Sequence, residues 1–317
     1  MKKLLGLALF LLGLYCLLLL SDANARSPAN HFNLGRRIGL YGILTLGAGC
    51  LIISGGIDLS IGSVVGLCAT VTAMLLVDHR WSPWAAIPAV LALGVAIGLV
   101  NGLLVTKLGV QAFVVTLCGL FIFRGAARWL ANDSVKGLGG RFGALKYALY
   151  ESKDVLGLPM SLVIFLVLAA LFTVFLHLSV YGRYLYAIGG NEQAARYAGV
   201  ATDRYKILAY VLSSGLAAFF AVLFLMEQNS VQPTNTGNFF ELYAIAGAVL
   251  GGCSLRGGEG NVLGMLIGTA ILWILPNLTR MWGVPSQLEY TVIGGALLLG
   301  ALLDERLRRR GERRGVH

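Results

Sequence analysis

Long apolar stretches, separated by short polar segments, run through the whole sequence. The hydrocarbon core of a bilayer is about 30 Å thick, and an α-helix needs roughly 20 apolar residues to cross it. The candidate spans are residues 4–20, 38–54, 60–77, 85–106, 111–131, 159–178, 207–227, 241–256, 261–279 and 287–303. The sequence therefore predicts an all-α integral membrane protein, a polytopic bundle of about ten transmembrane helices with Gly-rich helix breaks, in which residues 1–317 form a single transmembrane domain.

The composition agrees with this fold class. Of the 317 residues, 57% are hydrophobic and only 13% are charged, whereas about a quarter of a soluble domain is charged. Glycine, at 42 residues, lets helix backbones approach closely in lipid and provides positions where helices can break. The net charge of +10 does not indicate a nucleic-acid partner, because the basic residues lie between apolar stretches and near the C-terminus rather than along one face.

The cysteines and histidines do not form a recognisable metal-binding pattern. The five cysteines lie singly in apolar stretches without CxxC spacing, and the four histidines are scattered without an i,i+4 pair. We interpret the cysteines as small buried hydrophobic residues. The sequence therefore predicts neither a metal site nor a cofactor.

The first apolar stretch has two interpretations. Lys2, Lys3, the apolar run and Ala23-Asn24-Ala25 together look like a secretory signal peptide with its cleavage site. However, Leu4–Leu20 is longer than most signal peptide cores, and its removal would place the two termini on opposite sides of the membrane. We expect a retained first helix, with a cleaved signal as the alternative.

The distribution of basic residues predicts the orientation. Cytoplasmic loops carry an excess of Lys and Arg. The cluster Arg306–Arg314 therefore predicts a basic cytoplasmic tail at 304–317, and with an even number of spans both termini are cytoplasmic. Residues 179–206 then lie inside and 132–158 outside. Arg26, Arg36 and Arg37 would also lie outside, against the usual bias.

A polar, Gly-containing segment at Ser54–Ser63 interrupts an otherwise apolar tract. Gly55 and Gly56 can end one helix, and Asp58 or Ser60 can cap the next. One interpretation is that Asp58 is simply an N-cap at the membrane edge. The other is that the break lines the translocation pathway or its gate, because irregular backbone at membrane depth is tolerated only inside protein or beside water.

A second break has a similar Gly-Gly-x-x-Leu layout over Gly251–Asn261, in which Gly251, Gly252 and Ser254 are further pathway candidates. It lacks the GK[ST] ending of a phosphate-binding P-loop, and no such loop occurs elsewhere in the sequence. The sequence also has no HExxH, nucleophile elbow or paired carboxylates. We therefore expect no catalytic residues, and an enzyme is the least favoured class.

The stretch Tyr186–Val200 is polar but has the signals of an ordered helix. Asn191 can cap a short helix that starts with Glu192 and ends at Gly199. It is either an ordinary loop helix or a docking helix in which Glu192, Arg196 and Tyr197 engage a partner at the membrane surface.

Three carboxylates, Glu227, Glu241 and Glu289, lie at or inside the ends of predicted spans. Carboxylates within the membrane are functional candidates by default. Because each of these lies within a few residues of a span boundary, we expect them to be solvated at the interface.

Four sequence blocks resemble, in the same order, those of permease subunits of ribose-type monosaccharide ABC importers. They are GGIDLSIGS at Gly55–Ser63, GLVNGLLVTKLGVQAFVVTLCGLFIFRGA at Gly98–Ala126, YAIGGNEQAARYAGV at Tyr186–Val200, and GGCSLRGGEG at Gly251–Gly260. The resemblance extends from about residue 38 to 303. Tyr243 stands where the family usually has an acidic residue, Cys253 where Thr is usual, and Leu46–Cys50 reads LGAGC instead of the common LGMT. These departures leave the transported sugar open.

The resemblance implies a mechanism in which the chain performs no bond chemistry itself. Such permeases pair as homodimers or heterodimers in the inner membrane, and two cytoplasmic ATP-binding subunits dock on the loop corresponding to Tyr186–Asp203. The docking candidates here are Gly190, Asn191, Glu192, Ala195, Arg196 and Gly199. A periplasmic or lipid-anchored sugar-binding protein delivers the sugar, and ATP drives alternating access. The alternative is an ion-coupled secondary transporter, but these usually carry an ionisable residue near mid-membrane.

Overall fold

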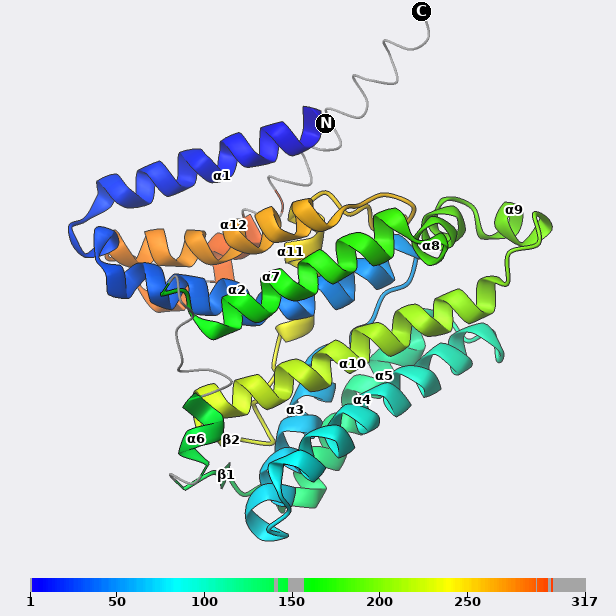
Figure 1. The fold of residues 1–317 in the computed structure, drawn as a ribbon, viewed down its shortest axis with the longest axis horizontal. Coiled ribbons are helices and arrows are strands. Elements are labelled where there is room, and N and C mark those ends of the chain that lie inside the picture. The colour runs from blue at the N-terminus through cyan, green and yellow to red at the C-terminus, as the bar shows by residue number, and fades with distance from the viewer. Residues whose placement is uncertain (1, 140–141, 148–156, 289, 296–297, 299–317) are drawn as a thin grey trace, which may run out of the picture.

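The computed structural model describes residues 2–139, 142–147, 157–288, 290–295 and 298, and it is almost entirely helical (Figure 1). The helices are α1 Lys2–Ser21, α2 Pro28–Ile53, α3 Ile61–Ala73, α4 Pro83–Thr106, α5 Ala112–Ala131, α6 Gly143–Lys146, α7 Met160–Thr173, α8 Val180–Gly190, α9 Glu192–Tyr197, α10 Thr202–Gln228, α11 Phe240–Leu250 and α12 Val262–Met281. Short π-helical turns at Met74–Asp78 and Val174–Leu178 extend α3 and α7, and 3₁₀ turns lie at Asn24–Arg26 and Ser286–Leu288. The predicted all-α class is confirmed.

Eight helices in the described part of the chain are long and apolar enough to cross a membrane. The second of them begins about ten residues before the predicted start at residue 38. Ser27 caps it by accepting a hydrogen bond from Asn30 N at 3.2 Å, and Pro28 occupies the first turn. The polar residues that lowered the apolar signal in this region are therefore helical, so the predicted boundary was wrong.

The eighth predicted span, 241–256, is shorter than expected. Helix α11 ends at Leu250 because Gly251 and Gly252 turn the chain, with Gly252 at a φ of +90°. The broken element that its glycines predicted is confirmed, but its predicted end is wrong. Of the tenth span, 287–303, residues 287 and 288 belong to the 3₁₀ turn and 290–295 and 298 are helical. The remaining positions of the span lie outside the described residues, as does the 304–317 tail.

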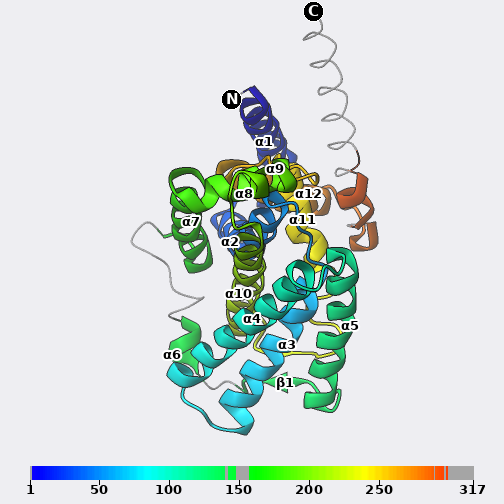
Figure 2. The same cartoon turned by 90° about the vertical axis from the view of Figure 1, so that its right-hand side faces the viewer.

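Helix α10 forms the centre of the bundle, packed along α4, α2 and α3 (Figures 1 and 2). Its contact with α4 is close because Gly94, Gly98 and Gly102 of α4 face it. A Cβ at Gly102 would lie 2.9 Å from the Cα of Ile207, for example. Small residues at one helix face let two backbones approach in this way.

Helix α1 lies at the periphery and packs against α12 (Figures 1 and 2). Leu14 and Leu18 are buried in that contact, and the Tyr15 hydroxyl lies 2.9 Å from His31 Nε2 at the start of α2. Most of its other leucines are exposed. This arrangement suits a helix that faces lipid on one side.

The two ends of the bundle differ. At one end lie α8 and α9. At the other, β1 (Lys136–Gly137) pairs antiparallel with β2 (Ser230–Val231), with α6 beside them (Figure 1). Lys136 Nζ also contacts Asp78 Oδ2 at 2.7 Å. The segments that we expect inside and outside are thus at opposite ends of the molecule.

Candidate functional site

The first helix break is an ordered linker. Helix α2 ends at Ile53, Gly55 has a φ of +80°, and Gly56 N donates to Leu51 O at 3.0 Å, as is usual where glycine ends a helix. The chain then runs without helical structure until α3 begins at Ile61.

Asp58 is the anchor of this linker. Its Oδ1 accepts hydrogen bonds from Ser60 N at 2.8 Å and Ser60 Oγ at 2.5 Å, and its exposed fraction is only 2%. Asn101 of α4 donates to Ser60 Oγ at 3.3 Å, and Tyr210 of α10 donates to the carbonyl of Ile57 at 3.3 Å. The interpretation of Asp58 as an N-cap at the membrane edge is therefore wrong, because the carboxylate is buried and bonds only two residues ahead.

The second break forms a compact loop between α11 and α12. Ser254 N donates to Glu259 O at 3.1 Å, and Gly257 N donates to Ser254 O at 2.9 Å. Asn261 then caps α12 by accepting from Gly264 N at 2.6 Å. Both breaks that the sequence indicated are thus real interruptions with local hydrogen bonds of their own.

The cysteines divide into two groups. Cys50, Cys68 and Cys253 are buried, whereas Cys16 and Cys118 are exposed, so the prediction of burial is wrong for these two. Cys253 is only 3% exposed, so its thiol is shielded by the surrounding protein. Within the described ranges, no three His, Cys, Asp or Glu side chains lie close enough together to hold a metal ion.

The predicted docking helix is present as α9, which follows α8 after a single residue. Asn191 caps it by accepting from Ala194 N at 3.0 Å, Glu192 lies in its first turn, and Gly199 just beyond its end has a φ of +84°. The capping pattern expected from the sequence is confirmed. Tyr197 is 90% exposed at the tip.

Charged side chains fasten α9 to the start of α10. Arg196 Nη2 contacts Asp203 Oδ1 at 3.0 Å, Lys206 Nζ contacts Glu192 Oε2 at 2.9 Å, and Lys107 Nζ contacts Asp203 Oδ2 at 2.6 Å. Arg196 also donates to Thr202 Oγ1 at 3.0 Å. Arg196 and Glu192 therefore hold α9 in place, while their partly exposed faces stay accessible.

Helix α8 meets both helix breaks at one place, which we call the coupling junction: Ile53, Gly55, Gly189, Gly257 and Gly258. Gly258 N donates to Ile53 O at 2.9 Å, and a Cβ on Gly257 would lie 2.9 Å from the Cα atoms of both Gly189 and Gly55. The contacts are therefore made backbone to backbone.

Two side chains add to this junction. Tyr186 of α8 donates its hydroxyl to Gly260 O at 2.7 Å, and its ring stacks on His177 with centroids 6.1 Å apart. His177 in turn accepts from Val262 N at 3.5 Å, at the start of α12. Helix α8 is thus tied directly to the second break.

The carboxylates at the span ends differ in how deeply they are buried. Glu241 is 8% exposed and accepts a hydrogen bond from Gly62 N at the start of α3, so the expectation of interfacial solvation is wrong for it. Arg124 of α5, which carries the opposite charge, donates to Pro233 O at 3.0 Å nearby. Glu227 is half-buried at the end of α10, and Glu289 lies outside the described residues.

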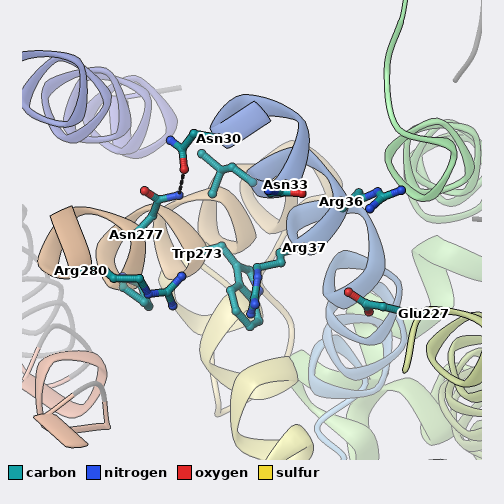
Figure 3. Close-up of a pocket in the computed structure, with 10 residues that line it drawn as sticks. Asn30, Asn33, Arg36, Arg37, Glu227, Trp273, Asn277 and Arg280 are labelled. Atoms are coloured by element: carbon teal, nitrogen blue, oxygen red, sulfur yellow. Dashed lines mark hydrogen bonds between the residues drawn. The ribbon is translucent and has the colours of Figure 1, made fainter. Parts of the chain in front are cut away.

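A polar cavity of about 330 Å³ lies between the start of α2, the end of α12 and the end of α10 (Figure 3). Its lining includes Asn30, Arg36, Arg37, Glu227, Trp273 and Asn277. The other ends of these three helices lie near α8 and α9, so the cavity is at the opposite end of the bundle. Sequence reasoning missed it, and the one available signal was the pair Arg36–Arg37 on the side where basic residues are unusual.

Comparison with known proteins identifies the family. Residues 30–302 match the family described as "Branched-chain amino acid transport system / permease component". The ribose import permease protein RbsC of Escherichia coli K12 is 36% identical over 277 residues, 87% of this chain and 86% of that protein. RbsC of Bacillus subtilis 168 is 34% identical over 299 residues, 93% of this chain and 91% of that protein. The autoinducer 2 import system permease protein LsrD of Enterobacter sp. 638 is 32% identical over 270 residues, 84% and 81% of the two chains. No solved structure matches the chain.

The chain therefore belongs to this family of transport permeases. It is a membrane-spanning permease subunit of an ABC importer, a multi-pass protein of the inner membrane. Such permeases work with ATP-binding subunits and a substrate-binding protein, so the chain is a transport subunit and not an enzyme. The family resemblance drawn from the motifs is confirmed, and nothing in the comparisons favours an ion-coupled transporter.

Proposed function

We propose that this permease carries a monosaccharide, of the ribose type or closely related to it, into the cytoplasm. The support comes from relatives that are named as ribose import permeases and are 34–36% identical over most of both chains. A relative that imports autoinducer 2 widens the range of substrates within the family. The departures at Tyr243 and Cys253 fit a sugar that differs from that of these relatives.

Two ATP-binding subunits dock at α8 and α9, one on each of two permease chains that form a homodimer or heterodimer. The observation that carries this proposal is the coupling junction, because a force on α8 acts on both helix breaks through direct backbone contacts. The breaks at Gly55–Ser60 and Gly251–Ser254 then gate the pathway. Residues 179–206 are the coupling loop of a single membrane domain, both termini are cytoplasmic, and α1 is retained.

The experiment is uptake by the reconstituted importer. The chain is assembled in proteoliposomes with its ATP-binding subunits and its binding protein, and uptake of radiolabelled D-ribose, D-xylose and D-galactose is measured with and without ATP. We expect ATP-dependent uptake of at least one of these sugars. Uptake by the chain alone, driven by a proton or sodium gradient, would overturn the proposal.

The docking surface is tested in the same assay with Arg196→Glu. This charge reversal places a third carboxylate beside Glu192 and Asp203, so α9 loses one of its two ion pairs with α10 and gains repulsion in its place. We expect at least a tenfold loss of uptake and loss of the ATP-binding subunits on purification, with a normal amount of chain in the membrane. The matched control is Arg204→Glu, a charge reversal at an exposed arginine at the start of α10, for which we expect a clearly smaller loss. Normal uptake by Arg196→Glu would refute docking at α9.

A further inference from the structure

The segment between β2 and α11, residues 232–239, is neither helix nor strand, yet it reaches the depth of the membrane core. In Figure 2 it is the yellow segment that runs across α3 toward α5. Arg124 of α5 donates to the carbonyl oxygens of Pro233, at 3.0 Å, and Thr236. Arg124 lies about 18 Å from the first residue of α5 and about 10 Å from the last. The segment, which we call the intramembrane loop, therefore lies well within a hydrocarbon core about 30 Å thick.

The intramembrane loop is ordered by its own hydrogen bonds and by a close contact with α3. Gln232 O accepts from Asn235 N at 3.0 Å and from Thr236 N at 2.8 Å, and Gln232 N donates to Thr236 Oγ1 at 3.0 Å. A Cβ on Gly62 of α3 would overlap Gly237 O. A surface that is ordered before it binds a ligand loses little conformational entropy on binding.

The exposed side chains of the intramembrane loop are mostly polar. Gln232, Asn235 and Asn238 are all exposed, whereas the neighbouring α5 exposes apolar side chains such as Phe121 and Ile122. Lipid offers an amide no hydrogen bond, and irregular backbone at this depth is tolerated only beside protein or water. These amides therefore face a water-filled space or another protein chain rather than lipid.

The chemistry of this surface suits a sugar. Asn235 Nδ2 lies 3.4 Å from Gln232 Oε1, so two of the amides are neighbours. Each amide has both donors and an acceptor, and a hydroxyl group can pair with either. Phe239, which is 51% exposed, adds an apolar ring beside Asn238, and a sugar ring has apolar C–H faces as well as hydroxyl groups. The three amides carry no charge, and Arg124 is engaged by backbone carbonyls, so an anion matches this surface poorly.

The intramembrane loop is also connected to both helix breaks. It runs directly into α11, an 11-residue helix that ends where Gly251 begins the second break. Gly237 touches Gly62, which follows the first break by two residues. A displacement at the coupling junction can therefore reach this surface through α11 and through the start of α3.

We propose that the intramembrane loop lines the translocation pathway, and that the amides of Gln232, Asn235 and Asn238 form hydrogen bonds with hydroxyl groups of the sugar in passage. The inference rests on the proposed function and deepens it, because it gives the permease a sugar-contacting surface at membrane depth. The two helix breaks gate the pathway, and this loop contacts what passes through it.

Cysteine accessibility tests whether the loop faces water. Asn235→Cys and Asn238→Cys are made in a chain that carries Cys16→Ser and Cys118→Ser, and the assembled importer in proteoliposomes is treated with a charged methanethiosulfonate. We expect both introduced cysteines to react. The matched control is Val167→Cys, 55% exposed on α7 and about 10 Å from the start of that helix. It should not react, because a charged reagent does not enter lipid.

Uptake of deoxy analogues tests the contact with sugar. The reconstituted importer is given the sugar that it transports and analogues of it that each lack one hydroxyl. We expect Asn235→Ala and Asn238→Ala to slow uptake of the sugar about two- to tenfold, the effect of one lost hydrogen bond. Uptake of the analogue without the matching hydroxyl should hardly change, because that bond is already absent. Gln111→Ala removes an exposed amide just before α5 and should leave the ratio of sugar to analogue unchanged.

The outcomes separate this inference from the proposed function. If the importer takes up a sugar but neither introduced cysteine reacts, a second chain or lipid covers the loop and the inference fails alone. It also fails alone if both alanine variants take up the sugar at the parental rate, or slow the sugar and all its analogues by the same factor. If no monosaccharide is taken up at all, the proposed function itself fails.

Discussion

Asp58 shows how one side chain can hold an interruption between two membrane helices. Its carboxylate bonds the next polar residue twice, and Asn101 and Tyr210 add bonds from two other helices. The linker therefore has one defined conformation although it has no helical hydrogen bonds. Asp58 Oδ2 is buried without a hydrogen-bond partner among the described residues, so the carboxylate holds the linker through Oδ1 alone.

Removing the Asp58 carboxylate should destabilise the protein. Asp58→Ala leaves the buried N–H and hydroxyl of Ser60 without their acceptor, which costs about 1–3 kcal/mol of unfolding free energy. Asp58→Asn keeps an acceptor oxygen and should lose less. Thermal unfolding of the purified variants in detergent, followed by size-exclusion chromatography, measures the order. An alanine variant as stable as the parent would contradict this account of the linker.

At the scale of elements, the coupling junction explains why three separate glycine pairs occur in the sequence. Gly55-Gly56, Gly189-Gly190 and Gly257-Gly258 come from a helix end, a surface helix and a loop, and all three meet. A side chain at the contact positions would push these elements apart. The junction thus requires residues without a Cβ for packing as well as for turning.

Gly189 and Gly190 of α8 are a matched pair of sites for alanine substitution, because only one of them is in close contact with the junction. A Cβ on Gly189 would overlap Ile53 O and Gly258 N, whereas a Cβ on Gly190 would meet no atom within 4 Å. Overpacking of this kind typically costs about 1–3 kcal/mol. We expect Gly189→Ala to lower the unfolding temperature in detergent by several degrees, and Gly190→Ala to leave it unchanged or slightly higher. Equal unfolding temperatures for the two variants would show that the contact is not tight.

Features formed by residues close together in the sequence could be predicted, and features formed by distant residues could not. The Asn191 cap, the α9 helix and both Gly-Gly breaks depend on residues a few positions apart, and they were predicted correctly. Glu241 was misjudged because its partner, Gly62, is far away in the sequence. The polar cavity was missed for the same reason, since Asn30, Glu227 and Asn277 come together only in the folded bundle. The start of α2 at Pro28 was not predicted, because its first turns are polar and hydropathy detects only apolar segments.

Considered whole, the molecule has two chemically different ends. The α8–α9 end carries the Arg196–Asp203 ion pair and the coupling junction, and the other end carries the β1–β2 pair and the polar cavity. If α9 faces the cytoplasm, the loop after α5 must face the periplasm. The orientation of the entire chain therefore follows from locating one exposed residue at each end.

Cysteine labelling tests this orientation. Val135 is 61% exposed beside β1, and Tyr197 is 90% exposed at the end of α9. In spheroplasts, a membrane-impermeant maleimide should label Val135→Cys and not Tyr197→Cys, and in inside-out vesicles the pattern should reverse. The parent chain, with its native cysteines, gives the background. Labelling of Tyr197→Cys in intact spheroplasts would invert the topology.

The coupling junction is built mainly from main-chain atoms, whereas the polar cavity is lined by side chains of α2, α10 and α12. A substitution in the cavity lining therefore changes a local contact, whereas a side chain added at the junction would displace whole helices. During evolution the lining of the cavity can therefore diverge between related permeases, while the junction tolerates almost no change.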